Sequence, residues 1–286
     1  MSIMTLEYYT LFCNNKGKRT LMQIHHMRNA TFVIQTKDKY ILIDPMLSDK
    51  AQLPPFSYLK HKIMKNPTVE LSSNSIDILS KVTHCLITHS QTFGIKALQH
   101  TDHLDSAAEV FLKNNNIPVF SISKDRSYLK KLGLNVEVCV NFWERTPYLG
   151  GFITAVPATH GHGWIHKLMA NGAGYFIELE DEPSIFISGD TVLTQDVKNA
   201  IENFQPALTV VAAGNASIDV GNDLLMSLDE VIEFIKLSPT KVMANHMEAL
   251  NHCPISRVEL KQRLEQEHLS QKVFIPEDGE SFEFGF

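Results

Sequence analysis

Apolar and polar residues alternate over short stretches at the front of the chain, a pattern that predicts β-strands. Residues 21–27, 31–36 and 40–44 are rich in β-branched and aromatic side chains, and Lys37-Asp38 makes a turn between the last two. Residues 46–75 then lose this periodicity and include several prolines. We expect them to form a long excursion or lid with one helical turn, because long loops of this kind are often functional.

Strand patterns and helix patterns alternate along the rest of the chain. The expected strands are residues 84–88, 118–122, 136–140, 146–149, 152–158, 174–179, 184–188, 208–213, 241–244, 272–275 and 281–284. The expected helices are residues 106–115, 124–132, 195–203, 227–237 and 254–266, the first of them opened by a capping box from Ser106 to Glu109. Both halves begin with strands and continue with helices, and no Pro/Gly/Ser-rich linker divides them. These features predict an α/β fold in which residues 1–286 form a single domain of two packed β-sheets with helices outside.

Composition and charge narrow the classes of partner. Hydrophobic residues make up 44% of the chain and charged residues 20%, which is typical of a globular protein. The net charge of −6 argues against nucleic acid as the main partner, because phosphate binding requires a basic face. The start of the chain lacks the pattern of a secretory signal, and no apolar run approaches the ~18 residues of a membrane span. The lack of such a run also predicts no membrane partner. The four cysteines lie far apart without a C-x-x-C pair, so we expect reduced thiols and a cytoplasmic location.

Potential metal ligands gather between a strand and a helix. His89 directly follows the strand expected at 84–88, and His100-Thr101-Asp102-His103 precedes the helix expected from Ser106. Three potential ligands within four residues cannot share one face of a helix or strand, so we expect a tight turn on which they converge. Imidazole nitrogens with a carboxylate oxygen form a ligand set that Zn²⁺ accepts, and Mn²⁺ or Fe²⁺ accept the same set. The alternative is that the histidines are solvated and that Asp102 caps the helix.

Five motifs follow one another along the chain, each at the end of an expected strand. They are Ile43-Asp44-Pro45, His89 with His100-Thr101-Asp102-His103, Pro157-Ala158-Thr159-His160-Gly161, Ser188-Gly189-Asp190-Thr191 and Asn245-His246. In this order they resemble the metallo-β-lactamase superfamily and its H-x-H-x-D-H signature, over nearly the whole chain. The resemblance is closest to the branch that contains L-ascorbate-6-phosphate lactonase and other metal-dependent hydrolases. It implies an αβ/βα sandwich with a metal site, built from loops, at one edge of the two sheets.

The resemblance also implies a role for each motif residue. His89, His100 and His160 would bind a first metal ion, and Asp102, His103 and His246 a second. Asp190 would bridge both ions, although an aspartate at that position could instead cap the following helix. One or two Zn²⁺ ions are the expected cofactor, with Mn²⁺ or Fe²⁺ as alternatives.

The sequence departs from the family pattern between its first two histidines. The family has one residue there, whereas ten residues, 90–99, separate His89 from His100. If this insertion is a surface loop whose ends lie close together, the two histidines still converge; if it is not, His89 leaves the site. We expect Phe93, Ile95 and Leu98 of the insertion to form a wall of the substrate pocket.

Four further residues are candidates for supporting roles. Asp44 ends an apolar strand, and the resemblance makes it a buried carboxylate that orients the histidine loop; the alternative is an ordinary turn residue. His162 and Trp164 follow the His160 motif among glycines that allow close approach of a ligand, and we expect both to contact substrate. For His252 we expect loop hydrogen bonding, with substrate contact as the alternative.

These features together predict a metal-dependent hydrolase. Water activated by the metal would attack a small polar ester, lactone or phosphoester, while Asp102 or Asp190 moves a proton. The G-x-S-x-G motif of serine hydrolases is absent from the sequence. Two alternatives remain open: a di-iron or sulfur-dioxygenase-type oxidoreductase on the same fold, and a non-catalytic metal-binding relative.

Overall fold

Two seven-stranded β-sheets form the centre of the protein in the computed structural model, which describes residues 22–285 except 92–93, 95 and 97–98. The first sheet has the order β14-β1-β2-β3-β4-β5-β6, and the second has the order β13-β12-β11-β10-β9-β8-β7. The strands of the first sheet are β1 (Met22–Arg28), β2 (Thr31–Gln35), β3 (Tyr40–Ile43), β4 (His84–Leu86), β5 (Val119–Ile122), β6 (Val136–Val140) and β14 (Ser281–Phe284). Those of the second are β7 (Arg145–Tyr148), β8 (Gly151–Pro157), β9 (Ala173–Glu178), β10 (Ile185–Ile187), β11 (Leu208–Ala212), β12 (Lys241–Asn245) and β13 (Val273–Phe274).

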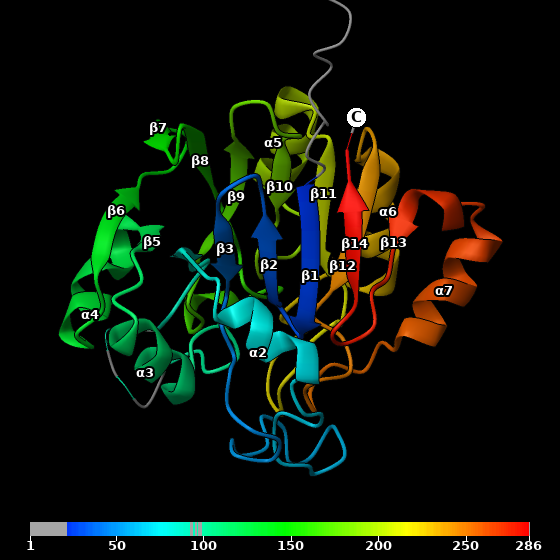
Figure 1. The fold of residues 1–286 in the computed structure, drawn as a ribbon. Coiled ribbons are helices and arrows are strands. Elements are labelled where there is room, and N and C mark those ends of the chain that lie inside the picture. Colours follow the sequence, from blue (N-terminus) through cyan, green and yellow to red (C-terminus); the bar gives the residue numbers. More distant parts are fainter. Residues whose placement is uncertain (1–21, 92–93, 95, 97–98, 286) are drawn as a thin grey trace, which may run out of the picture.

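Helices cover the outer faces of both sheets (Figure 1). They are α2 (Ser73–Leu79), α3 (Ser106–Asn114), α4 (Arg126–Lys131), α5 (Gln195–Phe204), α6 (Leu228–Leu237) and α7 (Arg257–Gln266). One apolar cluster fills the space between the sheets, and it joins residues such as Phe32 and Tyr175. A second lies between α5, α6, α7 and the second sheet, and a third lies between the first sheet and α3 and α4. The predicted architecture of two β-sheets with helices outside is therefore confirmed.

The direction of the strands brings five chain segments to one edge. Strands β3, β4, β5 and β6 run parallel, as do β10, β11, β12 and β13. Strand β8 is antiparallel to β9, which is antiparallel to β10, so β8 and β10 point the same way. The carboxyl ends of parallel strands meet at one edge of a sheet, where loops commonly carry functional residues. Asp44, His89, His160, Asp190 and His246 follow the ends of β3, β4, β8, β10 and β12.

The expected capping box of α3 is wrong. Asp105, not Ser106, is the N-cap, and its carboxylate accepts a hydrogen bond from the amide of Ala108 at 2.8 Å. Glu109 instead accepts a hydrogen bond from the side-chain amide of Gln99 and pairs with Lys96. The Glu109 carboxylate, which the capping box would have used, is thus engaged by Gln99 and Lys96.

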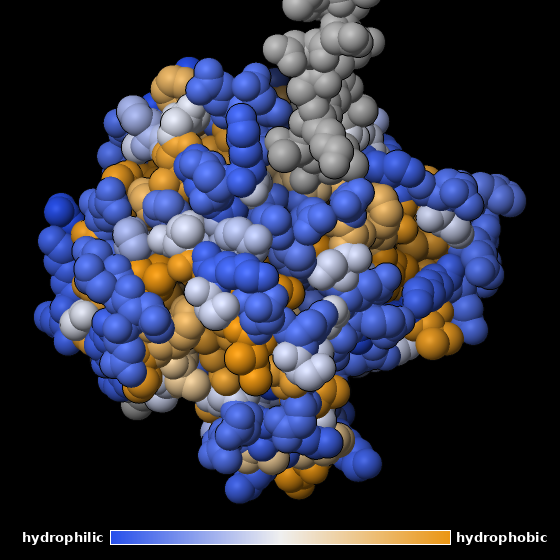
Figure 2. All heavy atoms as spheres, viewed as in Figure 1, coloured by the Kyte–Doolittle hydropathy of each residue, from blue (hydrophilic) through white to orange (hydrophobic). Residues whose placement is uncertain are grey.

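Residues 46–72 form the excursion, and hydrogen bonds fix it to the rest of the protein. The fully buried Arg28 donates to the carbonyl oxygens of Met46, Ser48 and Val69. The carboxylate of Asp219 accepts from the Ser57 hydroxyl and from three successive amides, of residues 58–60, and these donors lower its pKa. The excursion projects at the lower end of Figure 1, and Figure 2 shows hydrophobic side chains among the hydrophilic ones on its surface.

Within the part of the chain that the structure describes, none of the helices has the length and apolar character needed to cross a bilayer.

Candidate metal centre

Seven histidine and aspartate side chains form two clusters at the shared strand edge. In each cluster one donor atom per residue lies within 4.8 Å of every other. The first cluster contains His89, His100 and His160, and the second contains Asp102, His103, Asp190 and His246. The seven are the residues for which the sequence predicts metal binding. The clusters divide six of them as the resemblance implies, and Asp190, the expected bridge, falls with the second cluster. All are buried except His100, which is partly exposed.

The ends of the insertion lie together, so His89 stays in the site. Gln91 and Gln99 form an antiparallel bridge, and the amide of His100 donates to the carbonyl of Ser90 at 2.9 Å. The buried carboxylate of Asp125 accepts from both the amide and the hydroxyl of Ser90, which holds one end of the loop. The alternative in which His89 leaves the site is therefore wrong. Phe93, Ile95 and Leu98 lie outside the described residues.

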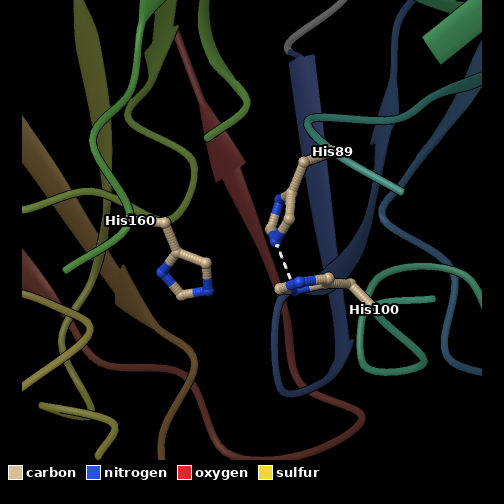
Figure 3. Close-up of side chains that lie close together, drawn as sticks. All are labelled: His89, His100 and His160. Atoms are coloured by element: carbon tan, nitrogen blue, oxygen red, sulfur yellow. Dashed lines mark hydrogen bonds between the residues drawn. The ribbon is translucent and has the colours of Figure 1, made fainter. Parts of the chain in front are cut away.

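The three rings of the first cluster face one another (Figure 3). His89 Nε2 lies 3.1 Å from His100 Nδ1. Two nitrogens that share a tetrahedral zinc ion with bonds of 2.0–2.1 Å stand about 3.3 Å apart. The spacing therefore fits a shared ion as well as a hydrogen bond between the two rings.

Asp190 lies between the two clusters. Its Oδ2 is 3.1 Å from His103 Nε2, 3.5 Å from His246 Nε2 and 3.7 Å from His160 Nε2. Its Oδ1 and His246 Nε2 are buried and have no hydrogen-bond partner among the described residues. Buried polar atoms almost always have a partner, so an ion is the simplest group to satisfy these two. The donor set of imidazoles and carboxylates fits a divalent metal.

Each of three histidines is oriented by a contact on the ring nitrogen that faces away from the centre. His103 Nδ1 lies 3.0 Å from the Asp44 carboxylate, and His160 Nδ1 lies 3.1 Å from the carbonyl of Leu224. His246 Nδ1 lies 3.5 Å from the sulfur of Cys253. Such contacts fix which nitrogen remains available to a metal and so raise its affinity.

Comparison with known proteins gives the chain a family. A search of protein-family models finds no match. Over 267 residues the chain is 32% identical to the UPF0173 protein YddR of Bacillus subtilis, an alignment that covers 92% of this chain and 100% of the relative. The chain belongs to the UPF0173 family of metal-dependent hydrolases. Another relative, 24% identical over 249 residues, is the UPF0173 metal-dependent hydrolase of Methylacidiphilum infernorum, with 87% of this chain and 94% of the relative covered.

Solved structures extend the likeness of this UPF0173 chain. A possible metal-dependent hydrolase from Veillonella parvula has a TM-score of 0.81 at 27% identity, covering 92% of this chain and 99% of that one. The isothiocyanate hydrolase from Delia radicum gut bacteria has a TM-score of 0.80 at 28% identity, with the same coverage. The metallo-β-lactamase fold protein YhfI of Bacillus subtilis has a TM-score of 0.59 at 11% identity, over 92% of this chain and 99% of that one, and shows the fold alone. These findings favour hydrolysis over the oxidoreductase alternative, whereas the likeness to the ascorbate-6-phosphate lactonase branch stays a prediction.

Burial and charge give the two clusters of this UPF0173 chain opposite protonation tendencies. Burial lowers the pKa of His89 well below its usual value and that of His100 to about 3, so both rings are neutral at pH 7. Burial also opposes the charge on His103, but Asp190, Asp102 and Asp44 overcome it and raise the pKa of His103 well above its usual value. Burial opposes ionisation of Asp190 as well, yet the nearby histidines hold its pKa well below the usual range. Without metal, protonated histidines therefore balance the carboxylates of the second cluster.

Metal binding to the second cluster should release protons. His103 and His246 have raised pKa values, so they hold protons at pH 7 that a metal must displace. For each ion bound to the second cluster we expect release of about one proton or more. The affinity of this cluster for metal should rise with pH until its histidines are neutral. Calorimetric titration of chelator-treated protein with Zn²⁺, repeated in buffers of different ionisation enthalpy, measures the release. No release at pH 7, or an affinity independent of pH between 6 and 8, would contradict this charge assignment.

Asp44 should be needed for both stability and metal affinity. Its carboxylate accepts from the amide and the hydroxyl of Thr88, each at 2.7 Å, and faces His103. In Asp44→Asn an NH₂ group would meet one of these donors, and we expect a loss of about 2–4 kcal/mol of unfolding free energy. Metal affinity should fall about 10–100-fold because His103 loses its orienting partner.

The matched control for this substitution is Asp38→Asn, before β3, where the side chain is exposed. Denaturant unfolding and competition for zinc with a chromophoric chelator measure the two effects. Equal behaviour of the two variants would show that Asp44 is an ordinary turn residue.

A cavity of about 270 Å³ opens beside the candidate ligands His100, Asp102 and His160. Its other lining residues come from separate parts of the chain and are Phe56, Gln99, Thr101, Leu168, Met169, Ile218, Leu224 and His252. The sequence offers a weak signal for His252, which lies near the Asn245-His246 motif, and none for Phe56, which lies in the aperiodic excursion.

His162 and Trp164 are not among the lining residues. His162 Nε2 lies 2.9 Å from a carboxylate oxygen of Glu230, and Trp164 is 55% exposed. Their expected contact with substrate stays a prediction.

Proposed function

We propose that this UPF0173 protein hydrolyses a small polar ester, lactone or phosphoester at a centre of one or two zinc ions. His89, His100 and His160 would hold one ion, and Asp102, His103 and His246 the other, with Asp190 between them. The observation that carries the proposal is the convergence of these donors around Asp190 Oδ1 and His246 Nε2, which lack hydrogen-bond partners among the described residues. Mn²⁺ or Fe²⁺ would fit the same donors.

The residues of the chain divide the chemistry among them. Bound divalent ions supply Lewis acidity, which activates water at neutral pH and polarises the bond under attack. Asp102 lines the cavity, and Asp190 lies between the two clusters. Either carboxylate would hold the proton that leaves the water. Asp44, His103 and Thr88 form a chain of contacts that keeps the second cluster aligned.

Isothiocyanate hydrolysis is a second candidate reaction. A protein of that activity shares 28% identity with this chain over 92% of its length, and the apolar residues that line part of the cavity suit an uncharged substrate. Attack of water on the central carbon of R–N=C=S, followed by loss of COS, releases a primary amine, so the reaction has its own readout.

A substrate panel on metal-defined protein tests both candidates. Protein is stripped with a chelator, reloaded with Zn²⁺, Mn²⁺ or Fe²⁺, and assayed against 4-nitrophenyl esters, lactones, phosphodiesters and allyl isothiocyanate. We expect turnover of at least one class, abolished by stripping and restored by metal. Turnover that is unchanged in protein with less than about a tenth of an ion per chain would contradict a metal-dependent site.

The proposal includes a small-molecule substrate in the cytoplasm rather than nucleic acid or a membrane. The net charge of −6 supports this choice of partner. Cell fractionation with an antibody to the protein would test the location.

A further inference from the structure

The cavity beside the candidate metal centre is lined in part by apolar side chains. Phe56, Leu168, Met169, Ile218 and Leu224 line it, and its lining contains no lysine or arginine among the described residues. Phe56 belongs to the excursion, which is fixed here because the side chain of Asn251 accepts from its amide at 2.9 Å. A charged group placed against this wall would lose its hydration without gaining a partner. An uncharged, apolar group would gain from burial there.

His252 places a polar ring beside the apolar side chains of this cavity. Its side chain lines the cavity although the residue is only 5% exposed. Its Nδ1 lies 3.9 Å from the sulfur of Cys253, and its ring packs edge-on against Phe56, with ring centroids 5.1 Å apart. No hydrogen bond reaches its Nε2 from the residues that the structure describes. The ring is therefore held on one edge and unpartnered on the other.

We propose, on the basis of the hydrolase function above, that this cavity binds a substrate with a short apolar group, and that His252 hydrogen-bonds the substrate through Nε2. The apolar wall receives the group that does not react, and His252 together with the metal-ligand residues receives the polar end. A ligand that occupies the cavity would displace water from this nitrogen, so a substrate group that pairs with it keeps a hydrogen bond that an apolar group would lose. The sequence offers substrate contact by His252 only as the alternative to loop hydrogen bonding, and names neither the atom nor the ligand class.

The first test measures the apolar wall with unreactive amides. Zinc-loaded protein is titrated calorimetrically with butanamide, pentanamide and hexanamide, and then with adipic acid monoamide, which has the chain length of hexanamide but ends in a carboxylate. We expect affinity to rise about threefold for each added methylene, because each buries more apolar surface. The carboxylate-ended amide should bind at least about tenfold more weakly than hexanamide. Equal binding of hexanamide and the monoamide, or an affinity independent of chain length, would overturn the proposed substrate class.

The second test isolates the hydrogen bond of His252. In His252→Leu, which has a similar volume and no polar atom, we expect the Kd for every amide to rise by about the same factor of five or more. In His252→Gln, which keeps a donor, the Kd should return to within about twofold of the original. His84→Gln, at the start of β4 and outside the cavity lining, serves as the control.

The two variants also separate a binding role from a structural one. A purely structural role would change the dependence on chain length in His252→Leu, whereas a binding role leaves that dependence intact. Equal Kd values for wild type and His252→Leu would overturn the assignment of His252.

The outcome is distinguishable from failure of the proposed function. Amide binding with the expected dependence, but no metal-dependent turnover in the substrate panel, would count against the hydrolase and support the cavity. Metal-dependent turnover without amide binding would support the hydrolase and count against the proposed role of the cavity.

Discussion

Asp190→Asn is expected to lose at least about a thousandfold in kcat/KM on the best panel substrate, because the activating metal is worth several kcal/mol. It should also retain at most one zinc ion per chain. The carboxylate of Asp190 is within 3.1–3.7 Å of ring nitrogens from both clusters, and the wild-type charge helps to offset the cations. Asparagine keeps the size of the side chain but removes the charge and one acceptor oxygen.

The control for this substitution is Asp181→Asn, in the turn between β9 and β10. That residue is exposed and has a φ of +62°, a backbone region that asparagine adopts readily. Steady-state kinetics and metal analysis by mass spectrometry are run on both variants. The N-cap of α5 is Thr194, so the structure already excludes Asp190 as a helix cap. If Asp190→Asn kept its activity and its metal content like Asp181→Asn, Asp190 would not bridge ions.

His89→Gln should lose the ion of the first cluster and about a hundredfold or more in kcat/KM, since three protein ligands is the usual number for a catalytic zinc. The prediction tests the unusual feature of this sequence, the ten residues between His89 and His100. The bridge between Gln91 and Gln99 closes the insertion at its base, and His89 Nε2 lies 3.1 Å from His100 Nδ1. The length of the insertion therefore does not remove His89 from the site.

The control for His89→Gln is a histidine at the other end of β4. His84 begins β4 and His89 follows its end, so the strand separates the two side chains. His84→Gln should keep both its metal content and its rate. Equal zinc content of the two variants would show that His89 is not a ligand.

The sequence predicts the fold well where local pattern and tertiary structure agree. The strands that precede Asp44, His160 and His246 are short and mostly apolar, and each is followed by a polar motif that marks the edge of the sheet. Because the motifs lie at strand ends, the order of the elements was enough to bring them together. The positions of both clusters follow from this topology.

Other features depend on contacts between residues far apart in the sequence. Phe56 meets His252, and Asp219 holds residues 57–60, through contacts that leave no periodic signal. The cap of α3 shows the same limit over a short distance. Ser106 and Asp105 are both competent caps, and Asp105 takes the role. Glu109, the partner that a capping box from Ser106 would need, contacts Gln99 and Lys96 instead.

The central claim is that the two clusters bind metal, and anomalous diffraction tests it most directly. Crystals of zinc-loaded protein are measured on both sides of the zinc absorption edge. The structure predicts one anomalous peak among the ring nitrogens of His89, His100 and His160, and a second beside His103 and His246, with Asp190 between the two. The absence of a peak from both clusters in zinc-loaded crystals would contradict the metal centre.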